Sequence, residues 1–197
     1  VTPNILKRTG EEIRFEELTQ LSIDLAKEAS KDYEALIAGS FPPIETSFRP
    51  DLTPKDEALS QFYSSIGSIM ENEVDLIICE TMSSIREGIQ AASTAKQYSD
   101  RVWLSWTTRG LNGEALPSGE SLIDAVNAAN ELNIECQLIN CSAMDIVTAQ
   151  IDTLKLAGKF GVFANSCILK NPINDLGEAF DIDENHHANT VTVSPKE

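Results

Sequence analysis

The sequence predicts an α/β fold in which a parallel sheet is covered on both faces. Five apolar runs of strand length alternate with segments of helical periodicity; they are residues 34–40, 75–81, 101–107, 134–141 and 160–167. Strands that are apolar almost throughout are typical of buried parallel sheets. The last four runs end in acidic, hydroxyl, amide or thiol side chains, and α/β enzymes build their sites at the carboxyl ends of such strands. The chain is therefore expected to be an enzyme, or part of one.

Helices are expected before and after these runs. The first has apolar residues at helical spacing, namely Phe15, Leu18, Leu21 and Leu25. The second has a start signal, in which Thr53 is the cap and Pro54 takes the first helical position. Its inward residues are expected to be Leu59, Phe62, Ile66 and Ile69.

The later helices follow the same alternation. Ser84 and Glu87 form the pattern of a capping box, in which each satisfies a backbone N–H group of the other residue. Inward residues of this helix and the next two are expected to be Ile85, Ile89 and Ala92, then Leu122, Val126, Ala129 and Leu132, then Val147, Ile151 and Leu154. The Gly-rich segment 109–119 is long for a connection, which makes it a candidate substrate loop.

A barrel is favoured over an open, doubly wound sheet. The open sheet normally carries a Gly-rich nucleotide-binding turn, and neither GxGxxG nor GxxxxGK[ST] occurs in the chain. A complete (β/α)₈ barrel needs about 250 residues and eight strands. This chain has 197 residues, and at its end residues 194–197 repeat the helix start signal with no helix after it. Residues 1–197 are therefore expected to be a single, incomplete TIM barrel domain, captured as a fragment.

Composition excludes several classes of partner. The chain has 15 basic and 31 acidic residues, and its net charge of −16 repels nucleic acids and anionic membranes. No apolar run approaches the roughly 18 residues of a membrane span, and the first residues do not have the pattern of a signal peptide. The four cysteines form no CxxC motif and no dense framework, which favours a reducing, cytoplasmic location with free thiols.

The ordered motifs resemble those of the homocysteine S-methyltransferase family, and the resemblance covers nearly the whole chain. The matching segments are residues 75–82 (DLIICETM), 103–107 (WLSWT), 116–119 (LPSG), 139–141 (INC) and 163–166 (FANS). The family fold is a (β/α)₈ barrel with zinc bound at its top by three cysteine thiolates. The resemblance implies that the five strands are about the third to the seventh of that barrel.

Site residues follow from the same resemblance. Cys141 matches a zinc-binding cysteine, and Glu80 matches the glutamate that holds the amino group of homocysteine. Asn140, Ser105 and Thr107 are weaker candidates for substrate binding. The implied reaction is attack of a Zn²⁺-bound homocysteine thiolate on the methyl group of a sulfonium, ammonium or pterin donor, which gives methionine. The sequence specifies neither the methyl donor nor the oligomeric state.

Two departures from the family pattern bear on activity. The chain contains neither the adjacent Cys-Cys pair that supplies the other two zinc ligands nor the amino-terminal Asp-Gly-Gly segment. A catalytic zinc site needs three protein ligands, so the fragment alone is expected to be inactive. Cys167 replaces a glycine of the family and is a doubtful further ligand. The acidic and histidine cluster at residues 181–187 lacks metal-ligand spacing and is interpreted as a solvated loop.

Other interpretations of the residues stay open. Cysteine is among the most buried residue types, so Cys141 taken alone would suit a core position. In one alternative the chain is a zinc-independent barrel enzyme, a lyase or hydrolase with Cys141 as the nucleophile. In another it is a non-catalytic remnant that binds homocysteine or a protein partner. Cys79 and Cys136 are expected to be packing residues.

Overall fold

The centre of the protein is a five-stranded parallel sheet. The structure is a computed structural model that describes residues 2–45, 47–109, 115–165, 167–169 and 190–192. Strands follow one another in the order of the sequence: β1 (Ala38–Phe41), β2 (Leu76–Met82), β3 (Val102–Trp106), β4 (Cys136–Ala143) and β5 (Phe160–Asn165). A short antiparallel pair, β6 (Cys167–Leu169) and β7 (Thr190–Thr192), lies beside this sheet. The predicted α/β class and parallel sheet are confirmed.

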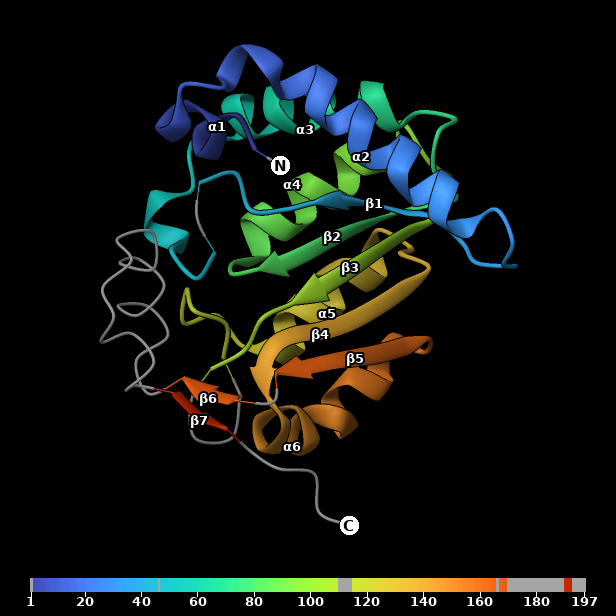
Figure 1. Cartoon of the computed structure of the whole chain (residues 1–197). Coiled ribbons are helices and arrows are strands. Elements are labelled where there is room, and N and C mark those ends of the chain that lie inside the picture. The colour runs from blue at the N-terminus through green and yellow to red at the C-terminus, as the bar shows by residue number, and fades with distance from the viewer. Residues whose placement is uncertain (1, 46, 110–114, 166, 170–189, 193–197) are drawn as a thin grey trace.

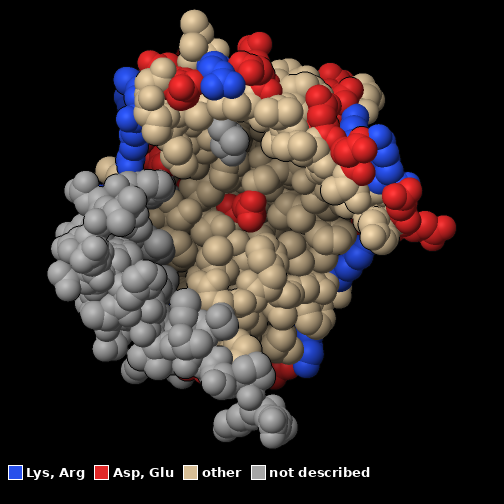
Figure 2. Space-filling view, viewed as in Figure 1, with Lys and Arg blue, Asp and Glu red and all other residues tan. Residues whose placement is uncertain are grey.

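In the described part of the chain, helices cover one face of the sheet and flank its β1 edge. They are α1 (Pro3–Thr9), α2 (Phe15–Ser30), α3 (Asp56–Met70), α4 (Ile85–Ala95), α5 (Leu122–Glu131) and α6 (Met144–Leu154), with 3₁₀ turns η1 (Glu12–Arg14), η2 (Pro50–Leu52) and η3 (Lys155–Ala157). Figure 1 shows α4, α5 and α6 behind the strands and α2 and α3 beside the β1 edge. The opposite face is hollowed in its middle (Figure 2). Among the described residues, the helices that follow the strands thus lie on one face of the sheet.

Strand order explains this one-sided arrangement. Parallel crossovers are almost always right-handed, so strands added in one direction place every connecting helix on the same face. A doubly wound sheet reverses its strand order at a switch point, and the order β1-β2-β3-β4-β5 has no reversal. The sheet is consistent with part of a (β/α)₈ barrel, but the described residues do not close it, because β1 and β5 are its edges.

The core lies between the strands and their helices. Fully buried side chains come from every layer and include Leu59, Ile77, Leu104, Trp106, Leu122 and Ile139. A Cβ atom at Gly88 of α4 would lie 2.5 Å from the Trp106 ring, so this glycine permits the close approach of helix and sheet. None of the described helices is long and apolar enough to span a membrane.

Several helix and strand boundaries differ by a few residues from those predicted from the sequence. The first strand begins at Ala38 rather than at residue 34, and the last long strand ends at Asn165, so Cys167 belongs to a separate strand. The second predicted helix begins at Asp56, and Thr53 does not cap it. Ser84 does cap α4 as expected, since its hydroxyl accepts a hydrogen bond from Glu87 N at 3.2 Å. The segments 181–187 and 194–197 lie outside the described residues.

The apolar spacing in the sequence matches the buried face of α2 only in part. Leu21 and Leu25 are 48% and 62% exposed, whereas Phe15, Thr19 and Ile23 are buried. The buried stripe contains a polar residue because the Thr19 hydroxyl donates a hydrogen bond to Phe15 O at 2.7 Å, within the helix itself. The leucines form a second apolar stripe, and packing against α3 and β1 selects between the two.

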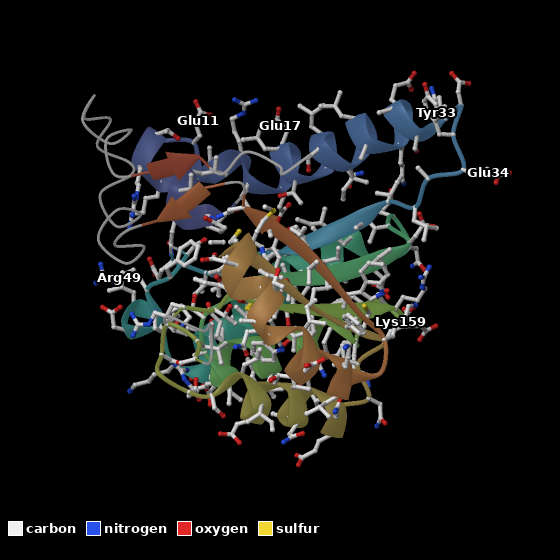
Figure 3. The ribbon with its side chains drawn as sticks, turned by 90° about the horizontal axis from the view of Figure 1, so that it is seen from below. Glu11, Glu17, Tyr33, Glu34, Arg49 and Lys159 are labelled. Atoms are coloured by element: carbon white, nitrogen blue, oxygen red, sulfur yellow. The ribbon has the colours of Figure 1, made fainter. Side chains whose placement is uncertain are left out.

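The five parallel strands β1–β5 all point toward one end of the molecule. Figure 3 shows Tyr33, Glu34 and Lys159 at the end where the strands begin and Arg49 at the end where they finish. At the amino end, Glu135 forms ion pairs with Arg101 and Lys159 at 3.2 and 2.6 Å. The candidate site residues Glu80 and Cys141 lie near the carboxyl ends of their strands.

The orientation of α2 gives a direct test. Ile23→Ala should lower the free energy of unfolding by about 2 to 4 kcal/mol, because it removes a buried side chain and leaves a cavity. Leu25→Ala is the matched control and should change it by no more than about 0.5 kcal/mol, because Leu25 is exposed. Urea unfolding of the full-length gene product measures both, and equal losses would contradict this placement of the helix.

Candidate functional site

The site begins with one acidic side chain in an uncharged hollow. Glu80 is the only acidic residue in strands β1–β5. Figure 2 shows acidic atoms in the middle of the hollow, with uncharged side chains around them and most other charges at the rim. Glu80 is partly buried, and its Oε1 accepts a hydrogen bond from the Ser40 hydroxyl of β1 at 2.5 Å. Sequence reasoning missed Ser40, although this hydroxyl also stands near the end of an apolar run.

The backbone is strained on both sides of the hollow. Thr81 and Cys141 have positive φ angles of 60° and 52°. Both positions coincide with irregular strand register, between Cys79 and Met82 in β2 and between Asn140 and Ala143 in β4. A β-branched residue with positive φ is a genuine outlier, and bulges of this kind redirect neighbouring side chains. Such strain concentrates at functional sites.

Asn140 ties three strand ends together. Its Oδ1 accepts hydrogen bonds from Thr81 N at 3.0 Å and from the Ser105 hydroxyl at 2.7 Å. Its Nδ2 donates to Thr81 Oγ1 at 2.8 Å and to Cys141 Sγ at 3.2 Å. Only an oxygen can face the Thr81 N–H, so the orientation of the amide is fixed. These four contacts use both acceptor and both donor positions of the side chain.

The predicted site residues therefore fall into two groups. Glu80 and Cys141 remain partly exposed, whereas Asn140, Ser105 and Thr107 are completely buried. The Thr107 hydroxyl lies 3.5 Å from Cys141 O, to which it donates. The structure brings all five residues together, and in this arrangement the buried three contact protein groups around Glu80 and Cys141.

The environment of Cys141 does not favour a free thiolate. Burial raises the pKa of the thiol, and the charge of Glu80 raises it further, while hydrogen bonds with Thr81 and Asn140 act in the opposite direction. The thiol is 3.6 Å from the Thr81 hydroxyl. Neither neighbour is a base that could accept its proton. A nearby positive charge such as a metal ion would be needed to stabilise the thiolate.

The described residues do not complete a metal site. Across them, no group of three or more His, Cys, Asp or Glu side chains is arranged to hold an ion. Cys141 supplies one thiol, and the side chain of Cys167 lies outside the described part of the chain. Cys79 and Cys136 are free and buried, which agrees with their expected packing role, and burial raises the pKa of both.

Comparison with solved structures shows the same fold in a known enzyme. The homocysteine methyltransferase MmuM from Escherichia coli in its metallated form is 23% identical, with a TM-score of 0.65, over 83% of this chain and 70% of that chain. The apo form is 22% identical with a TM-score of 0.61, over 77% and 68% of the two chains. The oxidized form is 22% identical with a TM-score of 0.65, over 83% and 70%. No curated protein sequence gives a match.

The sequence itself also matches a protein family. The family model for homocysteine S-methyltransferase matches residues 2–193, which is nearly the whole chain. The chain therefore belongs to the homocysteine S-methyltransferase family.

Proposed function

We propose that this protein takes part in methyl transfer to the thiol of homocysteine, with methionine as the product. One observation carries the proposal: a carboxylate and a thiol stand at the ends of β2 and β4, and a single buried amide holds both strand ends in place. An amino thiol such as homocysteine needs a carboxylate for its ammonium group and a site for its sulfur. Family membership supports the same substrate.

Glu80 binds the ammonium group of homocysteine in this proposal. Glu80 is partly buried, so an ion pair with the substrate would be screened less by water there than at the surface. Ser40 donates to Oε1 of Glu80 and thereby fixes the direction in which the second oxygen points. The carboxylate can then position the substrate before the reaction begins.

Cys141 is proposed to be one of the zinc ligands. A bound Zn²⁺ would keep the homocysteine sulfur deprotonated and nucleophilic near neutral pH. The described residues supply one thiol, so the remaining ligands must come from other residues. Asn140 and Thr81 contact the thiol through hydrogen bonds and orient it toward the hollow.

The alternatives have less support. A zinc-independent enzyme with Cys141 as nucleophile needs a general base, and the hydrogen-bond partners of the thiol are a hydroxyl and an amide. A non-catalytic homocysteine-binding protein would keep Glu80 but would not need Cys141.

Three free cysteines among the described residues fit a reducing compartment, and we propose a cytoplasmic location. The methyl donor is proposed only as a small sulfonium, ammonium or pterin compound.

Cys141→Ala should lower the zinc content of the purified full-length gene product, because the change removes one thiolate ligand. Cys136→Ala is the matched control, since Cys136 is buried in the same strand as a packing residue. We expect a smaller loss for Cys167→Ser than for Cys141→Ala. Elemental analysis after gel filtration measures metal per chain, and equal zinc in Cys141→Ala and the unmodified protein would remove the metal role.

Glu80→Gln should weaken homocysteine binding while zinc content stays the same. A charge-assisted hydrogen bond contributes about 1.5 to 3 kcal/mol, so the dissociation constant should rise about tenfold to a hundredfold. Calorimetric titration provides the measurement. As a control ligand, 4-mercaptobutanoate lacks the amino group and should bind the variant and the unmodified protein equally. An unchanged constant for homocysteine would exclude Glu80 from the ammonium site.

A further inference from the structure

The first turn of α4 holds loops from both sides of β2. Ser83 lies just before this turn and contacts both loops: its hydroxyl accepts a hydrogen bond from Phe48 N at 3.2 Å, and its carbonyl accepts one from Ser118 N at 3.1 Å. On the β3–α5 side, Glu120 accepts a hydrogen bond from Ile85 N at 2.8 Å. This turn directly follows the strained end of β2 that carries Glu80 and Thr81.

Glu87 has an unusual role in this turn. The sequence pattern suggested that its carboxylate would return to the cap residue Ser84. Instead, Oε1 accepts a hydrogen bond from Ile44 N at 3.3 Å, and Oε2 accepts one from the Thr53 hydroxyl at 3.2 Å. Both partners belong to the loop between β1 and α3, and Thr53 is the residue that was expected to cap the next helix.

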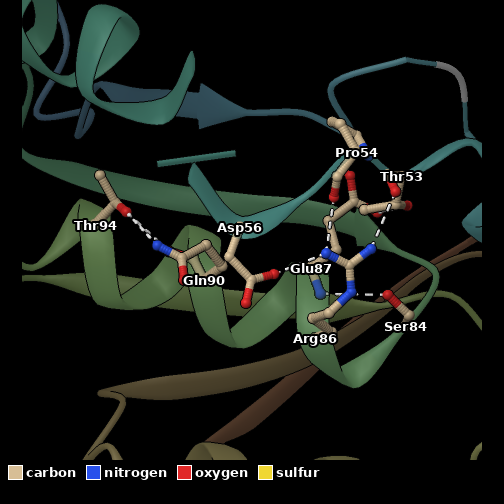
Figure 4. Close-up of polar contacts among 8 residues, drawn as sticks. All are labelled: Thr53, Pro54, Asp56, Ser84, Arg86, Glu87, Gln90 and Thr94. Carbon is tan, nitrogen blue, oxygen red and sulfur yellow. Dashed lines mark hydrogen bonds and ion pairs between the residues drawn. The ribbon is translucent and has the colours of Figure 1, made fainter. Parts of the chain in front are cut away.

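The carboxyl group of Glu87 is kept in an unfavourable environment. Glu87 is 2% exposed, and its burial raises its pKa in spite of these hydrogen bonds. Arg86 directs its guanidinium group at Thr53 O, Pro54 O and Asp56 instead (Figure 4). A buried carboxyl group without a bonded countercharge is costly. The two hydrogen bonds from the loop are the largest interactions that lower the pKa of Glu87, and the charge of Arg86 and a hydrogen bond with Tyr63 act in the same direction.

The anchored loop leads directly to the substrate site. It starts after β1, whose Ser40 is hydrogen-bonded to Glu80, and Ile44 follows only four residues later. The Tyr63 hydroxyl donates to Pro42 O at 3.2 Å, and Phe48 is buried with a φ of 67°. The loop is therefore fixed near its start, in its middle and at its end.

We propose that Glu87 is a positioning residue for homocysteine: it fixes the β1–α3 loop and thereby keeps Ser40 bonded to Glu80 in the geometry that receives the substrate ammonium. This inference rests on the proposed function of Glu80. Its effect lies in substrate affinity and not in the chemical step, because Glu87 does not touch the reacting sulfur.

The test compares three variants in the full-length gene product by calorimetric titration with homocysteine. Glu87→Ala should raise the dissociation constant about tenfold, because both loop anchors are lost. Glu87→Gln should bind within about threefold of the unmodified protein, since its amide oxygen can accept from Ile44 N and its amide nitrogen can donate to Thr53. Gln90→Ala changes the next turn of α4, where Gln90 contacts Thr94 (Figure 4), and should have no effect.

Further measurements separate positioning from general destabilisation. Glu87→Ala should raise KM for homocysteine while kcat at saturation is retained, and amide exchange should become faster at Ile44. If Glu87→Ala does not fold, Thr53→Val removes one of the two loop hydrogen bonds with little change of shape and should also raise the dissociation constant. Unchanged affinity in Glu87→Ala, or no rescue by Glu87→Gln, would overturn the proposal. If Glu80→Gln also binds normally, the proposed ammonium site itself fails.

Discussion

The four hydrogen bonds of Asn140 are the interaction on which the rest of the site depends. They connect the ends of β2, β3 and β4, and they satisfy the backbone N–H of Thr81, a residue with positive φ. A left-handed threonine persists only where its surroundings compensate for the strain. A fully satisfied buried network is rigid, whereas the loss of one member leaves costly unpaired groups. The amide therefore fixes the backbone from which Glu80 and Cys141 project.

The position of the helices determines which face of the sheet is accessible to a ligand. Because the strands follow in sequence order, the helices lie on one face, and the hollow lies on the other. Acidic residues outnumber basic ones two to one in the chain, yet within the five strands only Glu80 is acidic. Under the proposed function, this carboxylate would pair with the substrate ammonium, whereas charges at the surface are screened by water.

Sequence periodicity predicted the features that local chemistry controls. The alternation of strands and helices, the Ser84 cap and the strand-end positions of Glu80 and Cys141 all follow from residue type and spacing. The buried face of α2 follows from the spacing only in part: Phe15 is buried but Leu21 and Leu25 are exposed, because tertiary packing selects the buried face. Thr53 has good cap chemistry, yet its hydroxyl is donated to Glu87, 34 residues away. No sequence pattern shows the positive φ angles of Thr81 and Cys141, which arise from the bulges between neighbouring strands.

The same limits apply to the short polar residues near the strand ends. Ser40, Ser105, Thr107 and Asn140 are alike in sequence, since each is a short polar residue at the end of an apolar run. In the structure, Ser40 contacts the partly exposed Glu80, whereas the other three are fully buried against neighbouring strands. A buried hydroxyl or amide forms hydrogen bonds with the buried polar groups that would otherwise lack a partner. In this structure the hydrogen bonds of these polar residues therefore go to protein groups around Glu80 and Cys141, and these two side chains remain partly exposed.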